Sequence, residues 1–250
     1  MNSRRAEIGA LVGLLVLGLG LYALRWALFP SADFHNEMWR FLVGDIGFLC
    51  LQVALVTLLI DRLLKSRERQ AMFRKLNMVI GAFFSEVGTG LLGRLAVADT
   101  ALPEVREDLI PQMAWTDSNY RDAERAVAEH RPTIDLGSCD LEALKTLLVA
   151  EKPFLLGLLS NQALLEHEQF TELLWAVTHL AEELEARTGF TSLPAPDMIH
   201  LTGDVKRAYS LLTLQWLSYL QHLQTQYPYL FSLAVRLNPL DPDAHVEVTA

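Results

Sequence analysis

The sequence contains only two cysteines, Cys50 and Cys139, and this scarcity excludes a disulfide framework and a paired-cysteine zinc motif. Glycine-rich phosphate loops, nucleophile elbows and His-Glu-x-x-His zinc helices are also missing. No segment alternates polar and apolar residues with enrichment in β-branched side chains, so no strand is expected. These absences predict an all-α protein, and they favour a non-enzymatic role without deciding it.

Positive charge is scarce in most of the chain. Residues 76–250 contain eleven Lys and Arg against 24 Asp and Glu, whereas residues 1–75 contain ten against six. Nucleic-acid binding requires a basic face, so the acidic remainder argues against nucleic acid as a partner. Six basic residues near the front are suited to anionic lipid head groups, namely Arg62, Lys65, Arg67, Arg69, Arg74 and Lys75.

The N-terminal part of the chain contains two long apolar runs, and 51% of all residues in the chain are apolar. They cover roughly residues 8–28 and 41–63, and about 20 helical residues cross the roughly 30 Å hydrocarbon layer of a bilayer. We therefore predict two transmembrane helices. A cleaved signal peptide is the main alternative for the first run, but its apolar stretch normally has about 7–15 residues. A buried soluble helix is the other alternative, and the length and repetition of the runs disfavour it.

Basic residues also predict the orientation. Arg4 and Arg5 precede the first run, and the six basic residues named above follow the second. Lys and Arg near the ends of a span stay in the cytoplasm, so both termini are predicted to be cytoplasmic. The second run continues into a helix-forming segment, which predicts a stalk leading into a cytoplasmic helical bundle. The expected parts are an anchor (1–64), a basic stalk with the first cytoplasmic helix (65–98), an acidic helical domain (99–237) and a loose tail (238–250).

Capping residues and prolines predict the helices of the acidic domain. Ser118 and Asp140 are expected to cap two of them, Pro153 to open a third, Gly189 to close the fourth, and Pro196 to lie in the first turn of the fifth. The expected helices cover 119–130, 141–151, 153–159, 164–187, 197–224 and 229–237. Four glycines ahead of this domain predict a bend, namely Gly81, Gly88, Gly90 and Gly93.

Histidine and carboxylate side chains share one face of two of these helices. At 100° per residue, Glu168, Glu172, His179 and Glu183 fall within about 60° of one another, and His200 and Asp204 are likewise four residues apart. Such pairs on antiparallel helices build di-iron and di-manganese sites in helical bundles. We therefore regard a divalent metal as possible, with Glu86, His167 and His222 as additional candidate ligands.

The alternative explanation of this face is a solvated surface. Apolar residues occupy the opposite side of both helices, and a carboxylate stripe opposite an apolar face is usually exposed to water. The Glu-x-x-His pairs that define ferritin-like sites are also absent. The sequence leaves both explanations open, and no cofactor is predicted outright.

Two polar side chains interrupt the second apolar run. Asp45 lies about a turn inside the outer end, where it can reach water or pair with Arg40, and this structural explanation is favoured. In an oligomer, a ring of Asp45 and Gln52 would line a cation path. Gly9 and Gly13 have the Gly-x-x-x-Gly spacing that permits close helix contact, which weakly supports a homo-oligomer.

Several stretches are similar to a known family. These segments are residues 60–64, 75–89 and 164–184 and the stretch Tyr227-Pro-Tyr-Leu-Phe-Ser-Leu233. The four segments resemble a bacterial family of uncharacterised membrane proteins with two transmembrane helices. The resemblance implies a location in the bacterial inner membrane, and it brings no assigned activity, cofactor or catalytic residue.

Three hypotheses follow from the sequence. The leading one is a membrane-tethered helical module that binds or signals to a protein partner. The first alternative is a metal-binding, di-iron-like helical domain that uses His179, Glu183, His200 and Asp204. The second alternative is a subunit of an oligomeric channel or a transport accessory complex.

Overall fold

The chain divides into two helical units. The computed structural model describes residues 2–28, 34–161, 164 and 167–248, and for residues 2–11, 34–40, 42, 43, 66 and 68–75 it describes the backbone alone. The first unit is Met1–Ala71 and the second is Met72–Ala250. The described residues hold no strand, only one isolated antiparallel bridge between Asp99 and Ile134, which confirms the all-α fold class.

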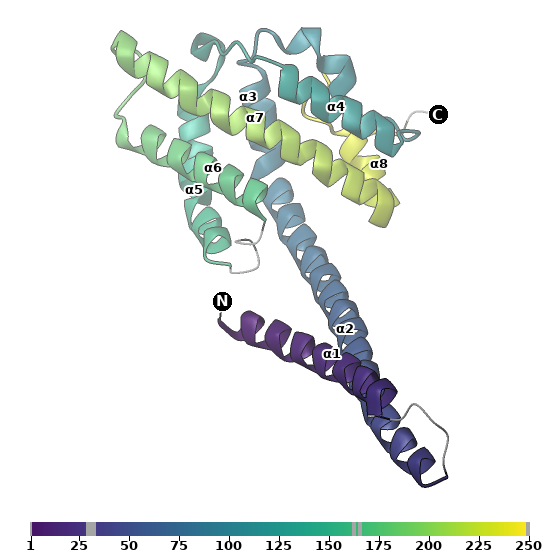
Figure 1. Cartoon of the computed structure of the whole chain (residues 1–250). Helices are drawn as coiled ribbons and strands as arrows, with labels where there is room; N and C mark the ends of the chain where they lie inside the picture. The colour runs from purple at the N-terminus through teal and green to yellow at the C-terminus, as the bar shows by residue number, and fades with distance from the viewer. Residues whose placement is uncertain (1, 29–33, 162–163, 165–166, 249–250) are drawn as a thin grey trace. The chain divides into compact units, whose positions relative to one another are not determined.

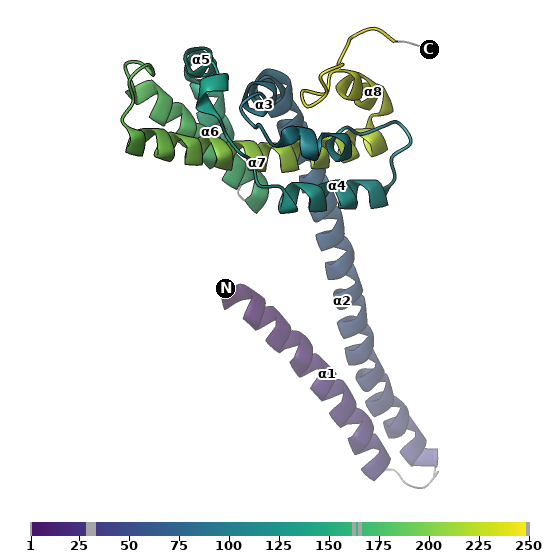
Figure 2. The same cartoon turned by 90° about the horizontal axis from the view of Figure 1, so that it is seen from above.

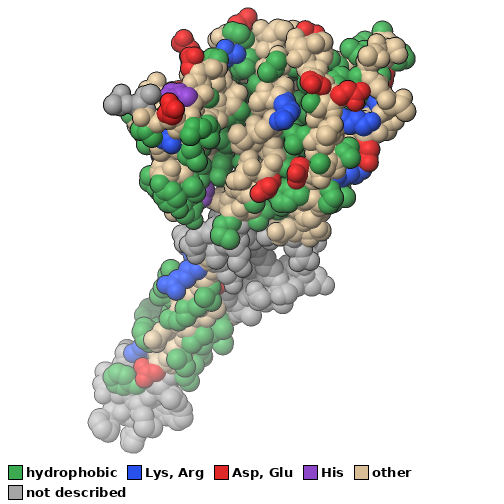
Figure 3. Space-filling view, turned by 180° about the vertical axis from the view of Figure 1, so that it is seen from behind, with side chains coloured by type: hydrophobic (Ala, Val, Ile, Leu, Met, Phe, Trp, Pro, Cys, Tyr) green, Lys and Arg blue, Asp and Glu red, His purple; other side chains and the backbone are tan. Residues whose placement is uncertain are grey.

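The first unit pairs helix α1 (Asn2–Leu28) with the beginning of helix α2 (Phe34–Phe83), as Figures 1 and 2 show. Glycines make the contact close. A Cβ atom on Gly18 would lie 3.2 Å from the carbonyl oxygen of Gly47, so a larger residue there would require the two helices to separate by a few tenths of an ångström. Large apolar side chains of both helices remain exposed, and Figure 3 shows several of them on the visible face.

Helix α2 has 50 residues and contains both the second apolar run and the basic segment behind it, as predicted. By length and composition, two described segments are suited to cross a membrane, Gly44–Lys65 and Leu76–Ala96, and Val12–Leu28 is a shorter apolar segment. Leu76–Ala96 belongs to the second unit and supplies much of its core. This leaves Gly44–Lys65 as the long apolar segment whose side chains are mostly exposed.

A π-helical turn, η1 (Phe84–Gly88), separates α2 from α3 (Thr89–Ala96). The chain therefore stays helical through the four glycines at which a bend was predicted. A π-helix takes one more residue into its turn than an α-helix does. Beyond Ile80, the buried positions accordingly include adjacent pairs, namely Phe83 with Phe84, Leu91 with Leu92, and Leu95 with Ala96.

Helix α7 (Ala195–Gln226) is the central element of the second unit. It packs against α3, α4 (Asp117–Glu129), α6 (Glu168–Ala186) and α8 (Pro228–Arg236), as Figures 1 and 2 show. Helix α5 (Leu141–Leu159) packs on the far side of α6. Short 3₁₀ turns connect these helices, namely η2 (Leu102–Glu104), η3 (Arg106–Leu109) and η4 (Leu136–Ser138).

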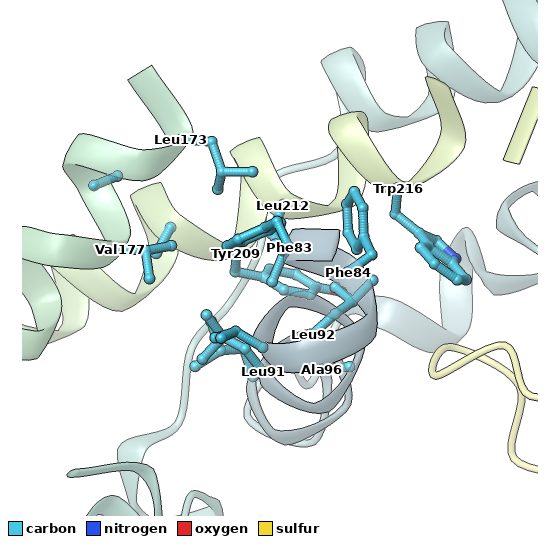
Figure 4. Packing of buried hydrophobic residues seen from close by; sticks show 14 of the residues in the cluster. Phe83, Phe84, Leu91, Leu92, Ala96, Leu173, Val177, Tyr209, Leu212 and Trp216 are labelled. Atoms are coloured by element: carbon cyan, nitrogen blue, oxygen red, sulfur yellow. The ribbon is translucent and has the colours of Figure 1, made fainter. Parts of the chain in front are cut away.

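Aromatic rings from α2, η1, α6 and α7 form the centre of the core (Figure 4). The ring centroid of Phe83 lies 5.4 Å from that of Phe170 on α6, edge to face. Phe84 lies 5.2 Å from Trp216 and stacks at 5.0 Å on Tyr219, both on α7. Each fully buried large side chain stabilises the fold by roughly 1.5–3 kcal/mol, so this cluster fixes α2, α6 and α7 against one another.

Two of the predicted helix boundaries in the first half of this unit are wrong. The cap of α4 is Thr116, whose backbone N–H donates to the Asn119 side chain at 2.9 Å, and Ser118 lies inside the helix. Pro153 lies within α5, so the two predicted helices are one. A proline removes one helical hydrogen bond and bends the helix, but buried Leu148 and Leu155 hold both sides of α5 in the core. The Asp140 cap is confirmed, since its side chain accepts the Ala143 N–H at 2.9 Å.

Helix α6 is shorter than predicted at its beginning. His167 caps it by accepting the Phe170 N–H at Nδ1, 3.2 Å away, so the helix begins at Glu168. It ends at Ala186 because Arg187 has an extended backbone, and Gly189 plays no left-handed capping role. Pro196 lies in the first turn of α7, as predicted.

The tail is partly packed, contrary to the expectation that it is loose from residue 238. Asn238 and Leu240 are buried. The Asn238 side-chain oxygen accepts the Trp216 indole N–H at 3.1 Å and the Leu240 backbone N–H at 3.2 Å. These bonds attach the beginning of the tail to α7.

Candidate metal centre

Four potential metal ligands meet between α6 and α7. His179 and Glu183 are one turn apart on α6, and His200 and Asp204 are one turn apart on α7. The helices run antiparallel, because Gln169 contacts Gln215 near one end of α6 and Arg187 contacts Asp197 just beyond the other. Two i,i+4 pairs therefore face each other, and each residue offers one ligand atom within 4.8 Å of the other three.

The distances within this quartet match a small coordination sphere. Asp204 Oδ2 lies 3.3 Å from His200 Nε2 and 3.6 Å from His179 Nε2. Glu183 Oε1 lies 3.6 Å from His200 Nε2 and 3.8 Å from His179 Nε2. Ligand bonds of about 2.1 Å at tetrahedral angles place ligand atoms roughly 3.4 Å apart. Two imidazole nitrogens and two carboxylate oxygens suit zinc, manganese or iron, so the residues fit a divalent transition metal.

The quartet is open on one side and buried on the other. The side chains of His179 and His200 are 44% and 53% exposed, whereas that of Asp204 is 6% exposed. Asp204 Oδ2 is fully buried and has no hydrogen-bond partner. A buried carboxylate oxygen that makes no hydrogen bond costs free energy, and a cation at the centre of the quartet would offset that cost.

Arg187 binds the carboxylate oxygen of Glu183 that does not face the two histidines. Its Nη1 donates to Glu183 Oε2 at 2.8 Å, while its Nε and Nη2 donate to Asp197 at 3.0 and 2.6 Å. The Arg187 guanidinium holds the pKa values of Glu183 and Asp197 below their usual range, mainly by these hydrogen bonds. Glu183 is therefore ionised at neutral pH, with Oε1 facing the two histidines.

Comparison with known proteins identifies the family of the chain. Family models described as the N-terminal and C-terminal helical domains of MJ1433 match residues 2–64 and 72–236. The chain is 39% identical over 241 residues to "Uncharacterized protein MJ1433" of Methanocaldococcus jannaschii, covering 96% of each protein. This chain belongs to the MJ1433 family. No solved structure matches it. The MJ1433 family includes an archaeal member, so a bacterial origin of this chain stays a prediction.

The remaining predicted ligands lie outside the quartet. Glu168 and Glu172 share the helix face of His179, but at 1.5 Å per residue they lie about 16 and 10 Å away from it along α6. Residues that bind one metal ion from the same helix must share a face of it, but they must also lie close together along the helix axis. His167 is the cap of α6, His222 accepts a hydrogen bond from Asn77 at 3.0 Å, and Glu86 is exposed. The arrangement among the described residues suits one ion rather than a di-iron pair.

Two polar residues that interrupt the second apolar run are exposed. Asp45 and Gln52 lie on the outside of α2 in the single chain, so a cation path through several copies stays a prediction. Among the six basic residues, Arg62, Lys65 and Arg67 are exposed, and Lys65 pairs with Asp61 at 2.5 Å. The structure does not describe the side chains of the other three basic residues, Arg69, Arg74 and Lys75. Gly9 of the predicted Gly-x-x-x-Gly motif is likewise described by its backbone alone.

Sequence reasoning missed a buried contact between Asp99 and His130 and the hydrogen bonds that Arg187 donates to Glu183. Asp99 Oδ2 lies 2.6 Å from His130 Nε2, and both side chains are almost inaccessible to solvent. Asp99 Oδ1 also accepts the backbone N–H of Thr133 at 2.9 Å, so this pair ties together a segment that the sequence marked as irregular. The two residues are 31 positions apart, and no local pattern links them. The contact between Arg187 and Glu183 could have been predicted from the sequence, because the two residues have the i,i+4 spacing of neighbours on a helix surface.

Proposed function

We propose that this protein is anchored in a membrane by α1 and α2 and binds one divalent transition-metal ion in its second unit. His179, Glu183, His200 and Asp204 would be the protein ligands. The observation that supports metal binding is the buried Asp204 Oδ2, which lacks a hydrogen-bond partner and faces two imidazole Nε2 atoms at 3.3 and 3.6 Å. A cation would serve as the missing partner of that oxygen.

Metal content of the purified full-length chain tests this proposal. After extraction in mild detergent, loading with zinc sulfate and dialysis, we expect close to one equivalent of zinc per chain. Asp204→Asn should lower the zinc affinity at least tenfold, since it removes one charged ligand. Glu172→Gln is the matched control, because Glu172 is a carboxylate on the same helix face outside the quartet. Less than a tenth of an equivalent in the unmodified chain, or equal losses in both variants, would refute the proposal.

Stability provides a second measurement of the same site. A ligand that binds only the folded state at about 100 times its dissociation constant stabilises that state by about 2.7 kcal/mol. Zinc should therefore raise the unfolding temperature of the unmodified chain and of Glu172→Gln, and chelation should reverse the increase. Asp204→Asn should show little response to zinc.

Exposed apolar side chains support the membrane anchor. Val16, Phe48 and Leu63 are 64%, 57% and 62% exposed, and water would make such a surface unfavourable. The flanking Lys and Arg residues favour an orientation with both termini on the cytoplasmic side. After cell lysis without detergent, the protein should sediment with membranes and resist carbonate extraction. Recovery of the full-length chain in the supernatant would refute the anchor.

A groove on the second unit favours protein-partner binding as a second candidate function. Its volume is about 340 Å³, and its lining includes Phe84, Trp216, Tyr219, Leu230 and Leu233. Apolar grooves of this kind accept the apolar face of a partner helix. A photo-cross-linking amino acid at Leu233 should trap one species of defined mass in membranes, and Leu230→Asp should abolish that product. The control position is Val97, which is also apolar and exposed, at 66% against 41% for Leu233, but lies outside the groove. Identical products from both positions would exclude this candidate.

A further inference from the structure

The two oxygen atoms of Glu183 have different partners. Oε1 lies 3.6 and 3.8 Å from the Nε2 atoms of His200 and His179, whereas Oε2 accepts a hydrogen bond from Arg187 Nη1 at 2.8 Å. A carboxylate that binds a metal through both oxygens must turn both toward the ion. While Arg187 holds Oε2, Glu183 has one oxygen to offer.

Arg187 is itself fixed from several directions. Its Nε and Nη2 form a two-point bond to Asp197, with distances of 3.0 and 2.6 Å, and its Nη1 also donates to the Glu183 carbonyl oxygen. Its own carbonyl oxygen accepts a hydrogen bond from Lys145 on α5. The side chain is 12% exposed, so the guanidinium has little room to move away from Glu183.

The number of available oxygens determines which metal fits. Zinc in protein sites is usually four-coordinate and tetrahedral, which two histidines and two single carboxylate oxygens complete. Manganese favours oxygen ligands in an octahedral arrangement, and calcium takes six to eight oxygen ligands, often with carboxylates bound through both atoms. We propose that Arg187 is a positioning residue that restricts Glu183 to one metal bond and thereby favours zinc over manganese. This inference rests on the proposed metal binding.

A comparison of zinc and manganese affinities tests the inference. Zinc sulfate and manganese chloride are titrated separately into the detergent-solubilised full chain, and the ratio of the two affinities is measured. In Arg187→Gln, Glu183 loses the hydrogen bond that keeps Oε1 toward the ion, and Oε2 becomes free to bind metal as well, so zinc affinity should fall relative to manganese affinity. Substitutions of residues that hold metal ligands typically change metal affinity 10–100-fold, so the ratio should fall about tenfold or more. Arg187→Lys keeps the charge and should recover part of the ratio.

An ion pair between α5 and α6 provides the matched control. Lys152 Nζ lies 2.6 Å from Glu185 Oε2, two residues from Glu183, and Lys152→Gln removes this pair without touching the quartet. The ratio in Lys152→Gln should equal that of the unmodified chain. If Arg187→Gln does not fold, Asp197→Asn loosens the guanidinium while leaving Arg187 in place, and the ratio should fall by a smaller factor.

The outcomes separate this inference from the proposed function. Binding of neither metal by the unmodified chain would refute the proposed function itself. Zinc binding with the same affinity ratio in the unmodified chain and in the Arg187 or Asp197 variant would refute the inference alone. A reduced ratio in those variants, with no change in Lys152→Gln, supports it.

Discussion

Both units of this chain are built from apolar helices, but they differ in where the apolar side chains lie. In the first unit, the described side chains of Gly44–Lys65 are mostly exposed, and Ala54 is among the few that are buried. In the second unit, the somewhat less apolar segment Leu76–Ala96 is 44% buried, against 17% for Gly44–Lys65, and its buried side chains belong to the core. Apolar length alone therefore does not distinguish a candidate membrane segment from a core helix, and burial is a necessary second criterion.

The largest expected difference between the units comes from removing a phenylalanine ring. Phe170→Ala removes a fully buried ring from the core and should reduce the free energy of unfolding of the second unit by about 3–5 kcal/mol. Phe48→Ala, at a position that is 57% exposed on α2, should leave that free energy almost unchanged. Thermal and denaturant unfolding of the full chain measures both. Equal effects would contradict the distinction between a packed unit and an unpacked one.

A lysine in the apolar surface tests what surrounds each unit. A lysine at the centre of a membrane helix costs roughly 2.5–3.5 kcal/mol on insertion, so Leu55→Lys should reduce the membrane-bound fraction. Val97→Lys, in the second unit at a position that is 66% exposed, is the control and should leave that fraction unchanged. Membrane sedimentation after lysis distinguishes them. No loss in Leu55→Lys would argue that water, rather than lipid, surrounds α2.

The buried amide of Asn238 tests how far the packed region extends. Asn238→Ala removes the acceptor of the Trp216 and Leu240 N–H groups and leaves them buried without partners. An unsatisfied buried polar group costs about 1–3 kcal/mol, and the free energy of unfolding should fall by that amount. Asp243→Ala, farther along the exposed tail, should have no measurable effect. A tail that contributes nothing would give the same result for both variants.

The smallest expected effect concerns the pH dependence of the second unit. Burial lowers the pKa of His222, which accepts a hydrogen bond from Asn77. A histidine whose pKa is lowered on folding binds more protons in the unfolded state, so the folded state loses stability as the pH falls below the ordinary value of about 6.5. Unfolding temperatures at pH 7.5 and 5.5 should differ less in His222→Gln than in the unmodified chain. An equal or larger difference in the variant would contradict this assignment.

The sequence predicted well which segments are helical, but it predicted poorly which residues of different helices contact one another. Periodicity and caps identified the long helices, including the Asp140 cap and Pro196 in the first turn of α7. Pro153 misled the prediction because buried leucines on both sides, which a local rule does not weigh, keep α5 continuous. The projection at 100° per residue grouped Glu168 and Glu172 with His179 because it ignores the distance between residues along the helix axis. Pairing of His179 and Glu183 with His200 and Asp204 became certain only with the antiparallel register of α6 and α7.

The π-helical turn at Phe84–Gly88 has a consequence for chain length. Such a turn corresponds to one residue inserted into an otherwise α-helical stretch. Deleting one residue within η1 should let the backbone close into ordinary α-helix, whereas the same deletion near Ile80 or Leu92 would turn every later side chain by about 100°. Relatives of this protein would therefore be expected to tolerate a single-residue gap at this turn more readily than anywhere else between α2 and α3.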